Sequence, residues 1–192
     1  LDGTASDKKW HLTLSIENGR VGDRPKVKLR SALREIANIG GVDFVLTSNQ
    51  NLVLANISTQ MKSSVEEILK KNGVLLETSS GLRRNAMACV ALPTCGLALA
   101  ESERYLPRVV DDLEMVLKAC GLENEDIVIR MTGCPNGCAR PYLAEIGLVG
   151  RSPGLYNLYL GAAFDGTRLS KLYAQDVGHE QILKLLSPLL QR

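Results

Sequence analysis

Aromatic residues are scarce in this sequence. One tryptophan, two phenylalanines and five tyrosines make up 4% of its 192 residues. Proteins that bind single-stranded nucleic acid stack bases on aromatic side chains set among basic residues. The formal net charge is only +2, and lysines and arginines are interspersed with acidic residues along the chain. The composition therefore argues against a nucleic-acid partner and an anionic membrane surface. It still allows a core, because 45% of the residues are hydrophobic.

Long apolar runs are also missing. No stretch approaches the roughly 18 consecutive apolar residues of a membrane-spanning helix, and the polar residues 1–9 do not resemble a signal peptide. These absences predict a cytoplasmic protein with no membrane partner. The sequence does not begin with methionine, from which we expect a processed product or a piece of a longer protein. Its two histidines, His11 and His179, lie near no nucleophile or carboxylate motif, and we expect structural roles for both.

Hydrophobic spacing predicts a compact α+β unit in the first part of the chain. Strand-like alternation and helix-like spacing of apolar residues follow one another between residues 9 and 77. The expected strands are 10–16, 42–46 and 52–57, and the expected helices are 27–39 and 59–72. This order is typical of a ferredoxin-like unit, and we place the first domain at residues 1–78.

The pattern of residues 79–192 predicts a second domain with mixed helices and strands. Together with the first unit, this gives the expected fold class α+β for the whole chain. A polar connection over residues 78–88 leads into it. Helices are expected at 97–105, 107–119 and 179–190, and strands at 126–131, 146–149 and 156–161. The cysteines of this domain fall in loops at the ends of these elements.

Four of the five cysteines form two close pairs, Cys89 with Cys95 and Cys134 with Cys138. In the cytoplasm, such pairs favour metal binding or redox chemistry over disulfides. Four thiolates converging from two loops make a complete ligand set for zinc or for a 4Fe-4S cluster. The spacings favour the cluster, and zinc stays open as the alternative.

Two neighbours of the second pair support a metal loop. Pro135 fixes one backbone angle and Gly137 permits a positive one, so the loop can wrap its amides around an anionic centre. The fifth cysteine, Cys120, follows a predicted helix and has no second cysteine nearby. We expect Cys120 to be an ordinary buried residue.

Three segments closely resemble the C-terminal half of assimilatory sulfite reductase haemoproteins, members of the sirohaem and iron-sulfur nitrite and sulfite reductase family. They are MACVALPTC at 87–95, ALAESER at 98–104 and TGCPNGCARPYLAEIGLVG at 132–150. The resemblance extends more weakly over nearly the whole chain. The sequence around Cys89 looks less like the nitrite-reducing branch.

The resemblance implies a 4Fe-4S cluster on Cys89, Cys95, Cys134 and Cys138, with the sulfur of Cys138 also bonded to the iron of a sirohaem. The implied reaction is the six-electron reduction of sulfite to sulfide in sulfur assimilation. The implied partners are sulfite, the N-terminal half of the haemoprotein, and an electron donor that is either a flavoprotein reductase or a ferredoxin. Relatives supply their sulfite-binding basic residues from the first repeat, so we expect this second repeat to be weakly active alone.

Weaker candidates for cofactor binding surround the cysteines. Asn136 lies inside the second pair and would lie against the macrocycle, although an asparagine also suits a tight turn. Arg130 and Arg140 flank this loop and could pair with sirohaem carboxylates, or form ordinary surface salt bridges. Asn49 and Gln50 belong to a loop that the family uses near sirohaem, but such polar residues are common between strands.

Other functions stay open at this point. One is a small stand-alone sulfite or nitrite reductase, which would also have both cysteine motifs in a short chain. The other is an interaction module without enzyme activity, stabilised by zinc or an iron-sulfur cluster on the same four cysteines. Beyond the ligands, the sequence identifies no catalytic residue.

Overall fold

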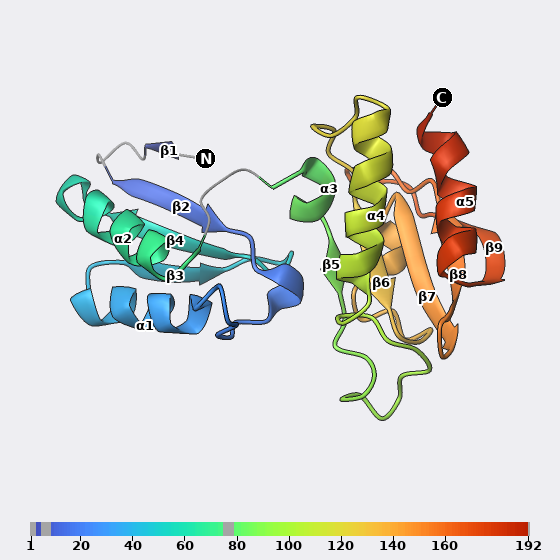
Figure 1. Ribbon diagram of the computed structural model, residues 1–192, viewed down its shortest axis with the longest axis horizontal. Helices are drawn as coiled ribbons and strands as arrows, with labels where there is room; N and C mark the ends of the chain where they lie inside the picture. Colours follow the sequence, from blue (N-terminus) through green and yellow to red (C-terminus); the bar gives the residue numbers. More distant parts are fainter. Residues whose placement is uncertain (1–2, 5–8, 75–78, 192) are drawn as a thin grey trace. The chain divides into compact units, whose positions relative to one another are not determined.

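The computed structural model describes residues 3–4, 9–74 and 79–191. The chain divides into two compact units, Leu1–Thr78 and Ser79–Arg192, which Figure 1 shows in blue to green and in green to red. Each unit has its own sheet and its own hydrophobic core. In the part of the chain that the structure describes, no helix is long and apolar enough to span a membrane.

The first unit is an antiparallel sheet with two helices, as its hydrophobic spacing predicts. The strands β1 (Gly3–Thr4), β2 (Trp10–Leu14), β4 (Leu52–Ile57) and β3 (Asp43–Leu46) lie in the order β1-β2-β4-β3. A short 3-10 helix, η1 (Glu17–Gly19), follows β2, and the two longer helices are α1 (Leu29–Ile39) and α2 (Thr59–Lys71). Leu12 pairs with Leu54, and Val45 pairs with Val53.

The core of the first unit is aliphatic. The helices contribute residues four apart, Ala32 and Ile36 from α1 and Val65 and Leu69 from α2, which places each pair on one helix face. They pack against apolar residues of β2 and β4. The edge strand β3 differs, because all four of its residues are exposed and Leu46 is 84% exposed.

The second unit is built on a five-stranded mixed sheet. Its strands are β5 (Met87–Ala88), β6 (Ile129–Thr132), β7 (Ile146–Ser152), β8 (Leu155–Leu160) and β9 (Lys171–Val177), in that order. The neighbours β5, β6 and β7 are parallel, whereas β8 and β9 are antiparallel to their neighbours. The helical segments are α3 (Gly81–Arg84), α4 (Leu106–Ala119), η2 (Pro141–Leu143) and α5 (His179–Leu190).

Helices α4 and α5 share one core with this sheet, and Figure 1 shows them side by side over it. Strand β6 contributes Ile129 and Met131 to that core. Because strand side chains alternate between the two faces, Arg130 and Thr132 lie on the opposite face. The sheet therefore has a helix-covered face and a second face that β6 supplies with polar side chains.

The structure corrects several sequence-based predictions. The helix expected at 97–105 is absent, because the backbone amides of Leu99 and Ala100 donate to Gly133 across the chain instead of to the preceding turn. Strand β9 was not predicted. The supposed polar connection contains α3 and β5, and β6 begins at Ile129 rather than at residue 126.

An ion-pair cluster ties α3 to α4 and predicts a pH dependence of stability. Arg83 contacts Glu114 at 3.0 Å through Nε and Asp111 at 2.6 Å through Nη2, and the Ser80 hydroxyl also donates to Glu114. Burial alone would raise the pKa of Glu114, but hydrogen bonds from Arg83 and Ser80 outweigh it and lower that pKa. The carboxylate therefore stabilises the fold above its ordinary pKa, and this contribution disappears as the pH falls through the lowered value.

We expect Glu114→Gln to lower the free energy of unfolding by about 1 kcal/mol at neutral pH, because the charge-assisted bonds to Arg83 weaken. Urea unfolding of both proteins at neutral pH and near pH 3 measures this. The difference should narrow at the lower pH. An equal difference at both pH values would contradict the assigned role of the carboxylate.

Candidate metal and cofactor site

Parallel strands bring Cys89 and Cys134 to the same end of the sheet. Strands β5 and β6 pair in parallel, with Ala88 opposite Met131. Cys89 comes directly after β5, and Cys134 lies two residues beyond Thr132, the last residue of β6. The amide of Cys89 donates to the Met131 carbonyl at 3.2 Å. The first cysteine of each pair is thus positioned by regular structure.

A backbone amide already points at one of the sulfurs. The N–H of Gly133 donates to Sγ of Cys89, with the two heavy atoms 3.3 Å apart. An amide directed at this sulfur suits a metal-binding cysteine, because surrounding hydrogen bonds orient metal ligands. Gly133 is also confined, since a Cβ there would lie 2.5 Å from the Ala91 side chain and 2.6 Å from the Ala100 carbonyl oxygen.

The second cysteine of each pair is held by a turn. The amide of Cys95 donates to the Ala91 carbonyl at 2.8 Å, and the peptide bond between Leu92 and Pro93 within this loop is cis. Cys134 is 8% exposed, whereas the Cys138 residue is exposed. Gly137 between them has the positive φ of 69° expected for this loop.

The complete ligand set of four cysteines stays a prediction. Across residues 3–4, 9–74 and 79–191, no group of three or more His, Cys, Asp or Glu side chains is arranged to hold a metal ion. The contacts above concern Cys89, Cys95 and Cys134 individually. The fifth cysteine, Cys120, caps the C-terminus of α4, the helix end predicted for it, but it is only partly buried.

The polar face of β6 contains buried groups suited to an anion. The Nε of Arg130 and the hydroxyl of Thr132 are buried, and neither has a hydrogen-bond partner among the described residues. Thr132 is 1% exposed. Burial, together with the positive charge of nearby Arg140, lowers the pKa of the Arg130 guanidinium. An anion would satisfy these donors and offset the repulsion between the arginines.

The chain after Cys138 returns across this same face. A Cβ on Gly147 of β7 would come within 2.3 Å of the Pro141 carbonyl oxygen, so η2 lies directly against the strand. Arg140 precedes η2 in the left-handed region, with φ of 54°. Its carbonyl oxygen lies 3.4 Å from Nη1 of Arg130. The two arginines predicted to bind a cofactor are therefore neighbours.

The remaining candidates are polar residues of turns. Asn136 is exposed between the cysteines of the second pair. Asn49 is exposed and Gln50 is partly buried, and both lie between β3 and β4 in the first unit. A cofactor role for these three residues stays a prediction.

Comparison with known proteins shows which proteins the chain is similar to. Residues 4–72 match the model of the nitrite/sulfite reductase ferredoxin-like half domain. Two curated relatives, from Paenibacillus sp. (strain JDR-2) and Oceanobacillus iheyensis, are named as the hemoprotein beta-component of NADPH sulfite reductase. They are 54% and 55% identical over 97% and 94% of this chain. The chain is homologous to part of the sulfite reductase haemoprotein. The resemblance predicted from its cysteine motifs is confirmed.

The matched region covers 33% and 31% of the two haemoproteins, so the chain spans about a third of their length. The solved structure of the Mycobacterium tuberculosis NirA protein matches 97% of this chain and 35% of NirA, with a TM-score of 0.76 and 23% identity. At that identity the likeness concerns the fold alone. It confirms the predicted α+β class, and the family match confirms the ferredoxin-like character of the first unit.

Residues 98–105 are called the 98–105 segment below, and most of them belong to the motif that resembles sulfite reductase haemoproteins. The segment lies within the predicted helix at 97–105. Instead, its amides at Leu99 and Ala100 both donate to the Gly133 carbonyl, at 2.8 and 3.0 Å, and the Glu103 amide donates to the Cys89 carbonyl at 3.0 Å. The segment thus contacts both cysteine-bearing loops. Its small residues and the glycines Gly133 and Gly150 were the signal that could have indicated close backbone packing.

Proposed function

We propose that this chain is the cluster-binding and sirohaem-binding C-terminal part of a sulfite reductase haemoprotein. Together with the rest of that protein it would catalyse the six-electron reduction of sulfite to sulfide. The observation that supports this most directly is the hydrogen bond from the Gly133 amide to Cys89 Sγ. This hydrogen bond lies at the end of the sheet where the parallel strands β5 and β6 place Cys89 and Cys134. The chain is also similar to a sulfite reductase haemoprotein.

In this proposal, Cys89, Cys95, Cys134 and Cys138 are the ligands of a 4Fe-4S cluster. Burial of Cys134 keeps water away from its sulfur, and the amide of Gly133 stabilises the Cys89 thiolate. The exposure of Cys138 suits a sulfur that must also reach the sirohaem iron. When bound, the cluster would store electrons and the sirohaem would bind the substrate.

Sirohaem is a polyanion, and the second face of the sheet offers donors for its carboxylates. Arg130 and Arg140 would hold carboxylate oxygens, and the Thr132 hydroxyl could donate to the same group. Asn136 would lie against the macrocycle from the cysteine loop. Asn49 and Gln50 are proposed as cofactor-binding residues from the family resemblance alone. No residue of this chain is assigned as an acid or base.

The other partners are proposed from the length of the relatives and from the edge of the first unit. The relatives are about three times longer than the matched region. Among the described residues, β3 pairs with β4 only, and its Phe44, Val45 and Leu46 are exposed. An unpaired apolar edge suits packing against the N-terminal half of the haemoprotein. Electrons would come from a flavoprotein reductase or a ferredoxin, and we place the protein in the cytoplasm.

Sulfite-dependent sulfide production by this chain, alone and together with the N-terminal half, tests the proposal. We expect little turnover by the chain alone, because the basic residues that bind sulfite are expected in the other half. Adding the N-terminal half should restore activity. Robust turnover by the 192 residues alone would instead support a small stand-alone reductase, and no activity in either sample would contradict the assigned reaction.

A further inference from the structure

The 98–105 segment contains one fully buried polar side chain that lies between the two cysteine loops. Ser102 has no exposed surface. Its hydroxyl donates to the Met131 carbonyl of β6 at 2.7 Å. The same carbonyl accepts the amide of Cys89 at 3.2 Å. Ser102 and the backbone of Cys89 therefore share one acceptor, at the end of the strand that leads to Cys134.

Ser102 also fixes the start of a helix. Its carbonyl accepts the amides of Tyr105 at 3.0 Å and of Leu106, the first residue of α4, at 2.8 Å. The next residue, Glu103, donates to the carbonyl of Cys89. One residue thus connects the rigid α4 to the backbone around a predicted ligand. A displacement of Ser102 would move the backbone of Cys89 with it.

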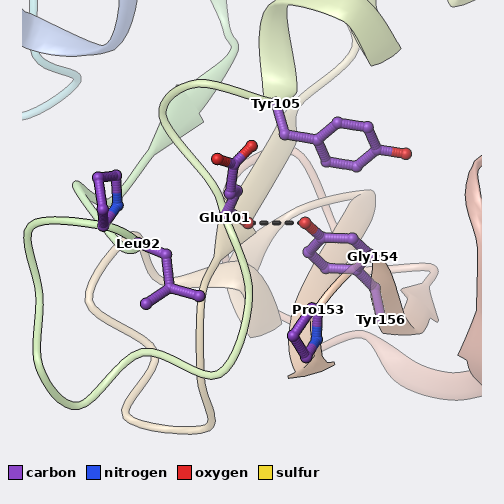
Figure 2. Close-up of a pocket in the computed structure, with 7 residues that line it drawn as sticks. Leu92, Glu101, Tyr105, Pro153, Gly154 and Tyr156 are labelled. Atoms are coloured by element: carbon purple, nitrogen blue, oxygen red, sulfur yellow. Dashed lines mark hydrogen bonds between the residues drawn. The ribbon is translucent and has the colours of Figure 1, made fainter.

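The outer side of the segment faces a cavity. Figure 2 shows this cavity, of about 400 Å³, between Leu92 of the first cysteine loop, Glu101 and Tyr105 of the segment, and the turn at Pro153 and Gly154. Tyr156 lines it and donates from its hydroxyl to the Glu101 carbonyl at 2.8 Å (Figure 2). On this side, the Tyr156 hydrogen bond holds the backbone of the segment.

A chain of side chains anchors this side to the helices. The ring of Tyr156 stacks on Tyr105, with centroids 5.3 Å apart. The Tyr105 hydroxyl lies 2.8 Å from Nδ1 of His179, whose Nε2 lies 2.8 Å from the Asp112 carboxylate. A carboxylate only accepts, so Nε2 of His179 donates to Asp112. These contacts link His179 to the support of the segment, and they place it beside the Asp112 carboxylate, which the sequence did not indicate.

We infer that Ser102 is a positioning residue for two of the proposed metal ligands: its hydroxyl bond to Met131 fixes the backbone of Cys89 and, through β6, the strand end that leads to Cys134. The inference rests on the proposed function. If Ser102 were only structural, its loss would destabilise all parts of the second unit equally. If Ser102 positions the ligands, its loss should destabilise the backbone near Cys89 more than the rest of the core.

The test compares Ser102→Ala with Ser187→Ala in the full chain. Ser187 is a matched control, because its hydroxyl also donates to a backbone carbonyl, that of Leu183, at 2.7 Å. Amide hydrogen exchange is measured without added iron at Cys89 and Gly133, and at Leu148 in the core strand β7. We expect exchange at Cys89 and Gly133 to be about tenfold faster in Ser102→Ala, and unchanged at Leu148. Ser187→Ala should leave Cys89 and Gly133 unchanged.

Equal acceleration at Leu148, or the same exchange at Cys89 and Gly133 in both variants, would overturn the inference. A second measurement follows iron release to a chelator from the loaded chain, which Ser102→Ala should accelerate and Ser187→Ala should not. A wild-type chain that takes up no iron-sulfur cluster would contradict the proposed function instead. In that case the exchange at Cys89 and Gly133 would still decide whether Ser102 positions the cysteine backbone.

Discussion

Cys138→Ser is expected to abolish both cofactor signals of this protein while leaving its fold intact. In the proposed site, the sulfur of Cys138 is shared between the cluster and the sirohaem iron, so its loss affects both centres. Because the residue is exposed, the substitution should change the free energy of unfolding by no more than about 0.5 kcal/mol. Visible absorption and iron content measure the cofactors, and circular dichroism monitors the fold.

Cys120→Ser is the matched control. Cys120 is partly buried at the C-terminus of α4, and its hydrogen bonds to Val116 and Leu117 come from the backbone amide. This variant should therefore keep the wild-type spectrum and iron content. Equal losses of cofactor in Cys138→Ser and Cys120→Ser would contradict the ligand assignment. Misfolding caused by the loss of any cysteine would then explain both results.

Gly133→Ala is expected to produce a large loss of stability. The added methyl group would lie 2.5 Å from the Ala91 side chain and 2.6 Å from the Ala100 carbonyl oxygen, closer than atoms approach in folded proteins. The carbonyl of Gly133 is also crowded, since a Cβ on Gly150 would lie 2.4 Å from it. Relief requires backbone movement in both cysteine loops. We expect a loss of about 3 kcal/mol in the free energy of unfolding.

Gly96→Ala provides the comparison within the same region. A Cβ at Gly96 meets no atom within 4 Å, and its φ is not in the left-handed region. Its loss of stability should stay within about 0.5 kcal/mol, and chemical unfolding of the two variants measures the difference. If Gly133→Ala were as stable as Gly96→Ala, that result would contradict the close packing of the backbone around Gly133.

Much of the fold was predictable because its signals are local. The amphipathic spacing of two sets of residues indicates two helices, and the structure places them as α1 and α2. The sets are Leu29, Leu33 and Ile36, and Val65, Ile68 and Leu69. The alternating residues of β2 and β4 likewise indicate strands. The terminal helix begins and ends at the predicted residues, His179 and Leu190.

The elements that were wrong depend on distant contacts. The 98–105 segment has enough apolar residues to suggest a helix, but Gly133, some 30 positions away, accepts its amides, and Leu97 and Leu99 are exposed. Strand β9 is mostly exposed and has little alternation to detect. At the site, the cysteine spacing indicated candidate ligands, whereas the polar face with Arg130 and Thr132 became visible only with the register of β6.

The central claim is that the four paired cysteines bind an iron-sulfur cluster next to a sirohaem. The most direct measurement is the visible absorption spectrum of the purified chain, recorded together with its iron, sulfide and zinc content. The account predicts cluster absorption with sirohaem bands, and iron and sulfide in equal amounts once the sirohaem iron is subtracted. A colourless protein that contains zinc and no iron would contradict it.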